Sequence, residues 1–344
     1  MSIKKYAVIS FTERGARARE RVVAALGDGA HADIYEKGAQ DLKAWVRERF
    51  FTADALVFIC AAGIAVRLIA PLISSKDRDP AVIAMDEGCR HVIPLLSGHI
   101  GGANALAVRL ADALGADAAV TTATDLNGVF AADAWAAEHG CAVGDISSIK
   151  HISSALLGGK TVGFYSDFPV SGPLPRGLAA SNGGAAGVCV SLDGGKRPFE
   201  TCLNLIPRIV TVGAGCRRGA DATLFEEFVL SVLEDRHVSR KAVRAVASID
   251  LKADEECIIK FARKYELDFV TYAANELRGA AYKGDDGADF SGSRFVAEVT
   301  GVDNVCERAA VMRGGGLIIR KTARDGMTFA AAAEDWRCEF DEDM

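Results

Sequence analysis

Apolar and polar residues follow two different periods along this chain. Short unbroken apolar runs, such as residues 6–11 and 55–60, are typical of strands buried on both faces of a sheet. Between such runs apolar residues recur at i, i+3, i+4 and i+7, as in residues 102–114, which is the pattern of an amphipathic helix. Strands that alternate with helices predict an α/β fold with mainly parallel sheets.

The same pattern predicts where the elements lie. Residues 141–207 interrupt it, because they hold five of the eight prolines and three Gly-Gly pairs between short β-like runs. We therefore predict two α/β domains with mainly parallel sheets, joined by a small β-rich middle domain. The expected boundaries are 1–138 for the N-terminal α/β domain, 139–206 for the middle linker domain, 207–333 for the C-terminal α/β domain and 334–344 for an acidic tail that frays. Further expected elements are strands at 89–96, 118–122, 209–212, 243–249, 269–272 and 317–321, and helices at 17–26, 223–233, 254–264 and 305–312.

Charge and cysteine usage narrow the class of protein. The formal charge of −6 argues against non-specific nucleic-acid binding. Nine cysteines are spread along the chain without any C-x-x-C, so we expect reduced thiols, a cytoplasmic protein and no metal site built from paired cysteines. The longest uncharged apolar run, residues 55–66, is too short for a membrane span. We expect no membrane partner.

The densest group of chemically useful residues lies in residues 74–125. SGHIGGAN (97–104) and TTATD (121–125) each follow or end a predicted strand, so they should meet at one rim of the sheet, where open α/β sheets bind ligands. Glycines 98, 101 and 102 allow close approach of a ligand, and a helix starting near Gly102 offers N–H groups to an anion. A tight turn that binds nothing explains the glycines equally well.

Each polar side chain in this stretch has a structural reading beside the functional one. His99 lies on the turn and is either a structural hydrogen-bonding group or a proton carrier. For Thr124 and Asp125 the favoured interpretation is that one of them caps the N-terminus of a helix that runs through Trp135, and a catalytic role comes second. Asp86 fits an ordinary hairpin turn. Ser97 is no serine nucleophile, because the G-x-S-x-G turn is absent.

A second glycine turn occupies residues 211–221. The spacing of its glycines, at 213, 215 and 219, is one residue longer than in G-x-G-x-x-G, and no acid ends the next predicted strand. A nicotinamide or flavin site is therefore disfavoured. Arg217 and Arg218 at the start of a helix could hold a carboxylate or a phosphate, or simply be solvated.

Long strings of the chain resemble the cobalt-precorrin-5A hydrolase family of the anaerobic cobalamin pathway. They include K-x-x-D-P-A-V at 76–82, LLSGHIGGAN at 95–104, TTATD at 121–125, VGAGCRRGA at 212–220 and TGVDNVCERAA at 300–310. The resemblance covers nearly the whole chain, although residues 141–207 match mainly in position and texture. It implies a hydrolase that opens the δ-lactone of a cobalt-bound corrin precursor, with loss of acetaldehyde and contraction of the macrocycle. The cobalt arrives inside the substrate, so no cofactor is expected.

Onto that reaction we place residues by our own inference. His99 is expected to act as base or as a ligand facing the cobalt, oriented by Asp86 or Asp125, with the N–H groups of Gly101 and Gly102 receiving the oxyanion. Glu307 is expected to be a buried polar contact or a second acid. The full set of expected substrate-binding residues is Lys76, Ser97, Gly98, Gly101, Gly102, Asn104, Thr121, Thr122, Thr124, Arg217 and Glu307.

The expected partner is a cobalt-corrinoid polycarboxylate substrate, with a homodimer or transient contacts to other pathway enzymes as further possibilities. Two rival functions stay open at this point. One is a tetrapyrrole-binding or carrier protein without catalysis, and the other is a nucleotide-dependent α/β enzyme, which the off-register glycines disfavour.

Overall fold

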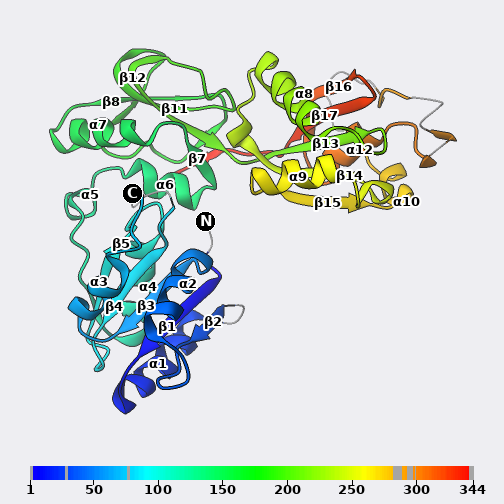
Figure 1. Ribbon diagram of the computed structural model, residues 1–344. Helices are drawn as coiled ribbons and strands as arrows, with labels where there is room; N and C mark the ends of the chain where they lie inside the picture. The colour runs from blue at the N-terminus through cyan, green and yellow to red at the C-terminus, as the bar shows by residue number, and fades with distance from the viewer. Residues whose placement is uncertain are drawn as a thin grey trace.

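The computed structural model describes residues 3–27, 30–75, 78–281, 289–292, 297–298 and 300–340. Within them the chain builds three large sheets in the order of the sequence, one for each of three regions (Figure 1), and a small two-stranded sheet of β9 (Val170–Ser171) and β18 (Cys338–Glu339). Most neighbouring strands are parallel, and each large sheet also contains antiparallel pairing. The predicted α/β class with mainly parallel sheets is therefore confirmed.

The N-terminal region is a six-stranded sheet in the order β2-β1-β3-β4-β5-β6. Helices α1 and α4 pack on one face and α2 and α3 on the other. The antiparallel β4–β5 hairpin reverses the direction of the chain, so the turn after β5 lies at the end of the sheet where β4 begins. The elements are β1 (Lys5–Ser10), α1 (Glu13–Leu26), β2 (His31–Ile34), α2 (Leu42–Thr52), β3 (Ala55–Ile59), α3 (Ala62–Ile69), β4 (Ala81–Met85), β5 (His91–Leu96), α4 (Ala103–Leu114), β6 (Asp117–Ala118) and α5 (Ala123–Leu126).

The middle region is a five-stranded sheet in the order β10-β8-β11-β12-β7. Its main core joins the sheet to α6 and α7, with Trp135 of α6 buried beside Phe164 and Leu203. Because α6 packs into this core, we propose that the first boundary lies before Phe130 and not after residue 138. The elements are α6 (Ala132–Glu138), β7 (Cys141–Val143), α7 (Ile146–Leu157), β8 (Val162–Ser166), β9 (Val170–Ser171), β10 (Leu178–Ala180), β11 (Gly184–Val190) and β12 (Phe199–Pro207).

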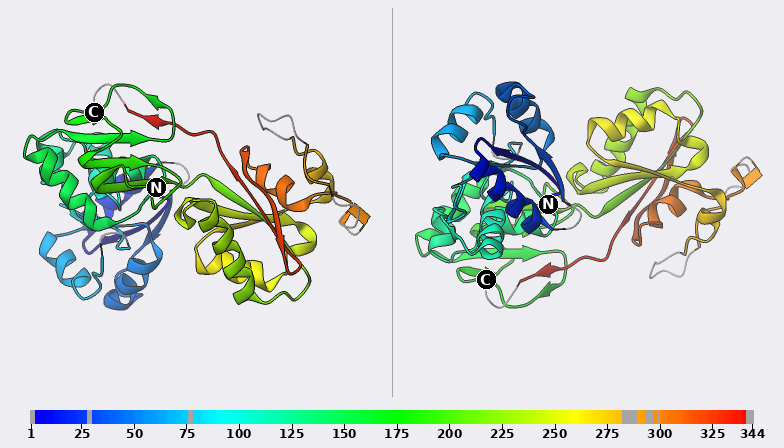
Figure 2. Two further views of the ribbon diagram at one scale, coloured as in Figure 1. Left: turned by 90° about the horizontal axis from the view of Figure 1, so that it is seen from above. Right: turned by 90° about the horizontal axis from the view of Figure 1, so that it is seen from below.

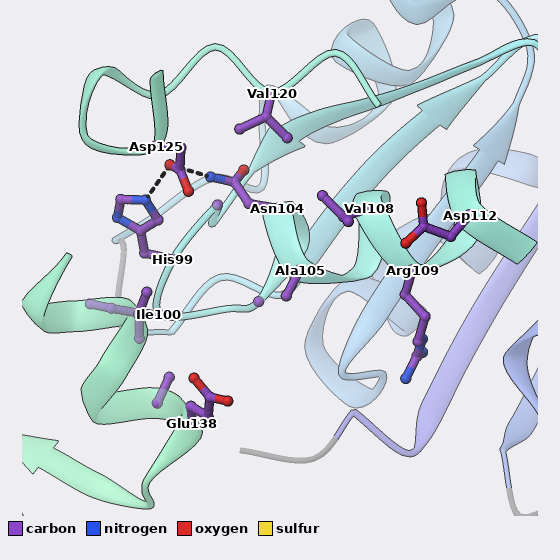
Figure 3. A pocket seen from close by; sticks show the side chains of 14 residues that line it. His99, Ile100, Asn104, Ala105, Val108, Arg109, Asp112, Val120, Asp125 and Glu138 are labelled. Carbon is purple, nitrogen blue, oxygen red and sulfur yellow. Dashed lines mark hydrogen bonds and ion pairs between the residues drawn. The ribbon is translucent and has the colours of Figure 1, made fainter. Parts of the chain in front are cut away.

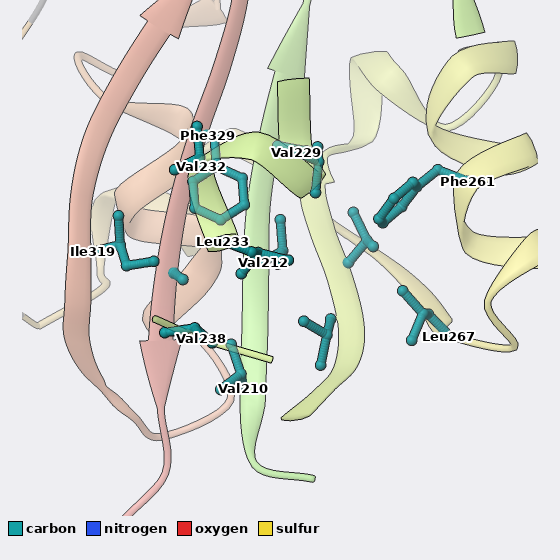
Figure 4. Packing of buried hydrophobic residues seen from close by; sticks show 14 of the residues in the cluster. Val210, Val212, Val229, Val232, Leu233, Val238, Phe261, Leu267, Ile319 and Phe329 are labelled. Carbon is teal, nitrogen blue, oxygen red and sulfur yellow. The ribbon is translucent and has the colours of Figure 1, made fainter. Parts of the chain in front are cut away.

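The C-terminal region is a five-stranded sheet in the order β15-β14-β13-β17-β16. Helices α8 and α9 cover one face, where Phe225, Phe261 and Phe329 are buried in the largest apolar cluster (Figure 4). Helices α10 and α12 lie against the other face. The elements are β13 (Val210–Cys216), α8 (Ala222–Asp235), β14 (Val243–Ile249), α9 (Glu256–Lys264), β15 (Asp268–Tyr272), α10 (Ala274–Arg278), α12 (Val305–Val311), β16 (Gly316–Arg324), β17 (Met327–Ala333) and β18 (Cys338–Glu339).

The last described residues leave the C-terminal sheet and return to the middle region (Figure 2). Strand β18 pairs in parallel with β9, and Cys338 and Phe340 are buried in the middle core beside Trp135. The expectation that the chain frays from residue 334 is therefore wrong up to Phe340. The acidic composition of this segment led to the prediction, but two of its apolar side chains, Cys338 and Phe340, anchor it in the middle core.

Two predicted elements differ from the structure, and others were not predicted. The strand expected at 118–122 is only Asp117–Ala118, and β2, β4, β17, α2 and α3 are among the elements that the sequence analysis did not predict. The helix expected from Thr124 or Asp125 through Trp135 is two helices, α5 and α6, separated by residues 127–131. The N-cap of α5 is Thr122, without a side-chain capping bond, so the capping role expected of Thr124 and Asp125 is wrong.

Two general expectations concern thiols and membranes. All nine cysteines are free thiols, as their spacing predicted. Among the helices of the described residues, none has both the length and the apolar character that crossing a bilayer requires.

Candidate active site between the N-terminal and middle regions

The turn from β5 to α4, residues 97–102, is closed by its own backbone. The N–H groups of Gly102, Ala103 and Asn104 donate to the carbonyls of His99, Ser97 and Gly98, at 2.9, 3.1 and 2.9 Å. The first N–H groups of α4 are thus already used, and Gly102 has no free N–H for an oxyanion, contrary to expectation. A Cβ on Gly98 would lie 2.7 Å from the Asn104 side-chain oxygen, so glycine is required there by packing.

Ser97 holds the start of this turn in an unusual conformation. Its φ of 56° is in the left-handed region, which non-glycine residues rarely adopt. The Ser97 hydroxyl donates to the carbonyl of Asp79 at 2.9 Å, which ties the turn to the loop before β4. This bond gives Ser97 a structural role in the turn. His99 follows this strained residue by two positions, so the conformation of Ser97 helps to set the direction of the His99 side chain.

His99 lies between two carboxylates that come from different regions. Its Nε2 is 2.8 Å from Oδ2 of Asp125 in α5, and its Nδ1 is 3.0 Å from Oδ1 of Asp133 in α6. The side chains of His99 and Asp133 are each 11% exposed, whereas that of Asp125 is 37% exposed. The imidazole is therefore anchored from the buried side by Asp133 and meets the more open carboxylate of Asp125 with its other nitrogen.

These contacts determine the charge of His99. The hydrogen bond to Asp133 raises its pKa most, burial opposes the rise, and the bond to Asp125 adds to it, so the pKa is about 9. At neutral pH the ring is protonated and donates from both nitrogens. A protonated imidazole enters a reaction as an acid, whereas the role of base expected from the sequence would require that His99 first lose a proton. A role as cobalt ligand would require that Nε2 first leave Asp125.

Asn104 and two threonines complete the arrangement. Asn104 Nδ2 donates to Thr122 Oγ1 at 2.8 Å and to Asp125 Oδ2 at 3.2 Å. Thr124 Oγ1 lies 3.4 Å from His99 Nε2. Asp125 Oδ2 thus receives two donors, while its Oδ1 has no hydrogen-bond partner among the described residues. The structure brings together SGHIGGAN and TTATD, as the sequence predicted.

A cavity of about 710 Å³ opens beside His99 and Asp125 (Figure 3). Its walls come from α4, with Ala105 and Val108, and from α6, with Ala134 and Glu138. A second hollow of about 430 Å³ shares residues 98–100 and Asn104 with the first, and reaches Thr121, Thr122 and Asp133. The cavity has the size of a small-molecule site, and His99 and Asn104 line both hollows.

The cavity is not the basic cluster that a polycarboxylate was expected to meet. Arg109 lines it, yet its guanidinium donates to Tyr6 Oη at 2.8 Å, and Asp112 and Glu138 also line the wall. Protonated His99 is the second cationic group of this lining.

Asp86 does not orient His99. It lies in the turn between β4 and β5, at the opposite end of the hairpin from Ser97. Its carboxylate accepts from the N–H groups of Gly88, Arg90 and His91 at 2.8, 2.9 and 2.7 Å. Burial acts to raise its pKa, but these three bonds together lower it below the usual value. Asp86 is a turn-forming residue, as the structural reading of the sequence stated.

Two other expected binding residues, Arg217 and Glu307, are not at this site, and a third cannot be placed. Arg217 is exposed after β13, in the C-terminal region, which Figure 1 shows apart from the N-terminal sheet. Glu307 is fully buried in α12, where it accepts from the N–H groups of Ser291 and Lys321 at 2.9 and 2.8 Å, so it is the buried polar contact and not a substrate-binding acid. Lys76 lies outside the described residues.

The sequence analysis missed Asp133. It occurs in the helix that was expected to run on from Asp125, and nothing in its local pattern separates it from a solvated acid in a first helical turn. Only its 8% exposure and its contact with a residue 34 positions earlier mark it. A break at Asn127 and Gly128 could have shown that α6 is a separate helix.

Chemically, the group offers an acid, a carboxylate and a donor around one cavity. Protonated His99 can stabilise a developing oxyanion or protonate a leaving oxygen, and Asp125 Oδ1 can accept a proton from water. Such a set suits hydrolysis of an ester-like bond.

Comparisons with known proteins agree with this layout. Three sequence-family profiles match the chain: cobalamin synthesis G N-terminal over residues 44–125, cobalamin biosynthesis central region over 130–207 and cobalamin synthesis G C-terminus over 210–332. A cobalt-precorrin-5A hydrolase of Salmonella typhimurium is 36% identical in an alignment of 292 positions that covers 81% of each chain. One of Priestia megaterium is 27% identical in an alignment of 340 positions that covers 90% of this chain and 89% of that one.

A solved structure of a cobalamin biosynthesis protein G homolog from Sulfolobus solfataricus aligns with 96% of this chain and 97% of its own. The TM-score is 0.43 and the identity is 22%. The sequence relatives and the profiles, which follow one another along the chain, show that the chain belongs to the cobalt-precorrin-5A hydrolase family.

Proposed function

We propose that this chain is a cobalt-precorrin-5A hydrolase of cobalamin biosynthesis whose active site is the cavity between α4 and α6. Membership of the family supports the reaction. The observation that carries the location is His99, held between Asp125 and Asp133 on the wall of the cavity. The substrate is a cobalt-bound macrocycle with a δ-lactone, and the cobalt belongs to it.

Asp125 and His99 divide the first step between them. Water attacks the lactone carbonyl and gives a proton to Asp125 Oδ1, the oxygen that has no other partner among the described residues. His99 Nε2–H, which contacts Asp125 Oδ2 at 2.8 Å in the free protein, turns its donation to the developing oxyanion. Asp133 stays bound to Nδ1 throughout and keeps the ring in place.

The second step follows from the bond that hydrolysis breaks. Cleavage of the carbon–oxygen bond frees the former ester oxygen as an alkoxide on the two-carbon fragment. When this oxygen forms a carbonyl, the carbon–carbon bond to the macrocycle breaks and acetaldehyde leaves. The electron pair remains on the macrocycle, which takes up a proton. One water is consumed for each acetaldehyde released.

The test is acetaldehyde release from the cobalt-lactone substrate. The wild-type protein should release acetaldehyde, and His99→Ala should lower turnover by about 10² or more because it removes the hydrogen-bond donor to the oxyanion. His151→Ala, an exposed histidine on α7, is the matched control and should keep wild-type turnover.

Two outcomes contradict parts of this proposal. Binding of the corrinoid without any acetaldehyde would reject the hydrolase and favour the non-catalytic carrier. Full turnover by His99→Ala would leave the reaction intact but reject this site.

A further inference from the structure

A second group of chemically active side chains lies in the C-terminal region, outside the proposed active site. Cys216 ends β13, Glu255 precedes α9 and Cys257 is in the first turn of α9. One sulfur or oxygen atom of each residue lies within 4.8 Å of the others. Among the described residues this is the one such group of three or more histidine, cysteine or acidic side chains.

The spacing within this group matches a tetrahedral metal centre. The two sulfurs are 3.5 Å apart, and Cys216 Sγ is 3.8 Å from Glu255 Oε2. With metal–sulfur bonds of about 2.3 Å and metal–oxygen bonds of about 2.1 Å, the edges of a tetrahedron are about 3.5–3.8 Å. The sulfur–sulfur and Cys216–Glu255 spacings therefore already suit a bound metal ion, and the Cys257 sulfur lies within 4.8 Å of the Glu255 oxygen.

Glu255 is placed in a way that its helix does not explain. It stands at the N-cap position of α9, yet its side chain makes no capping bond to that helix. Instead the carboxylate, 4% exposed, turns toward Cys216 and accepts from the N–H of Gly219 at 3.2 Å. Lys252 Nζ holds the other carboxylate oxygen at 3.0 Å. These donors fix the carboxylate in the way that outer partners fix metal ligands.

The charges also balance. Two thiolates and one carboxylate carry −3, a divalent ion brings +2, and the Lys252 ammonium beside Glu255 supplies the remaining +1. The Arg218 guanidinium, 4.0 Å from the Glu255 carboxylate, is balanced by the Asp254 carboxylate at 3.5 Å. Cys257 is 1% exposed, whereas Cys216 is half-buried, so access to the group is from the Cys216 side. A sulfur-rich set of three ligands suits zinc-class ions and leaves a fourth position open.

We propose that Cys216, Glu255 and Cys257 bind a divalent metal ion of the zinc class, with one coordination position left for an exchangeable ligand. This site is separate from the substrate's cobalt and is independent of the proposed active site. It also revises the expectation that the chain has no metal site built from paired cysteines, because Cys216 and Cys257 pair through the fold and not through a C-x-x-C motif.

Cobalt(II) alone is the probe for this site, added to reduced, metal-free, full-length protein. One equivalent should give intense thiolate-to-cobalt absorption, and Zn²⁺ should abolish it by displacement. Cys216→Ser and Cys257→Ser should each lose the absorption. Cys306→Ser is the matched control, because Cys306 is a buried thiol of the same region that donates to Asn304 Oδ1, and it should keep the absorption.

Glu255→Gln should keep the thiolate absorption but weaken the affinity for the metal ion by about tenfold or more. Loss of a group that only orients a metal ligand already weakens metal affinity by at least this factor. A measurement on the wild-type protein does not depend on the folding of any variant: Zn²⁺ should protect Cys216 from alkylation, as read by peptide mass spectrometry. Absence of thiolate–cobalt absorption, or equal alkylation with and without Zn²⁺, overturns the proposal. Conversion of the pair to a disulfide that forms regardless of Zn²⁺ overturns it as well.

Discussion

The turn at residues 97–102 and the segment at residues 213–221 each contain three glycines and lead into a helix, yet they assemble different chemistry. The second segment, hereafter the second turn, includes the end of β13 and the loop to α8. The first brings a histidine to two carboxylates, one of them from the middle region. The second brings a cysteine to a cysteine and a glutamate within its own region. The comparison teaches that glycines supply the close approach of backbone, while the chemistry comes from distant segments that pack against the turn.

The two turns also use their glycines differently. Gly98 makes room for the Asn104 side chain, which serves the site. Gly213 makes room for the backbone of Cys306, so that α12 packs directly on β13. Glycine in the first turn therefore supports the proposed chemistry, and glycine in the second supports the fold.

The largest expected effect is a pH dependence of stability that resides in the first turn. His99 has a pKa of about 9 in the folded protein, above the ordinary value of 6.5. A raised pKa means that its stabilisation is complete below pH of about 6.5 and is lost as the pH rises through about 9, up to about 3 kcal/mol. The free energy of unfolding from urea titrations should fall between these pH values in the wild type and not in His99→Asn. Asp125 and Asp133 are the charged groups that face His99. Parallel curves for the two proteins would contradict the prediction.

The next effect tests the second turn. Gly213→Ala places a Cβ against the carbonyl of Cys306, and should lower the free energy of unfolding by about 2 kcal/mol, as overpacking typically does. Gly219→Ala is the matched control, because no atom lies within 4 Å of its Cβ position and only its φ of 72° opposes the change. It should cost about 1 kcal/mol. A larger loss for Gly219→Ala than for Gly213→Ala would show that backbone conformation, and not α12 packing, decides this turn.

A smaller effect distinguishes the contributions of Asp133 and Asp125 to the pKa of His99. Asp133→Asn removes the strongest cause of the raised His99 pKa, so turnover should fall about tenfold or more and its alkaline limit, near pH 9 in the wild type, should move to lower pH. The readout is the pH profile of acetaldehyde release. Asp125→Asn should also lower turnover but move the limit less. An unchanged pH profile in Asp133→Asn would mean that the residue only joins the two regions.

The smallest effect concerns Arg217. Because it is exposed in the C-terminal region, Arg217→Ala should change turnover and KM for the cobalt-lactone substrate by less than about twofold, within the usual range of surface substitutions. Steady-state kinetics check this. A marked rise in KM would show that the C-terminal region closes onto the substrate.

Much of the N-terminal site could be predicted from local signals. The apolar period placed the helix that begins after Gly102, and strand ends placed SGHIGGAN and TTATD at one rim. Of the two acids expected to orient His99, the structure places Asp125 beside the imidazole and Asp86 away from it. Both acids follow predicted strands or turns, but the antiparallel β4–β5 pairing places Asp86 at the far end of the hairpin. Strand direction is a property of the sheet, which a single sequence does not specify.

The sequence by itself determined the α/β class, the three-part order of the chain and the family, because these depend on local periodicity, composition and long motif strings. Only the tertiary structure decided that Asp133 holds His99, that Glu255 and Cys257 meet Cys216, and that the acidic C-terminal segment returns to β9. Each of these contacts joins residues far apart in the chain. Their formation is determined by packing of apolar surfaces around them, which leaves no mark at the contacting residues themselves.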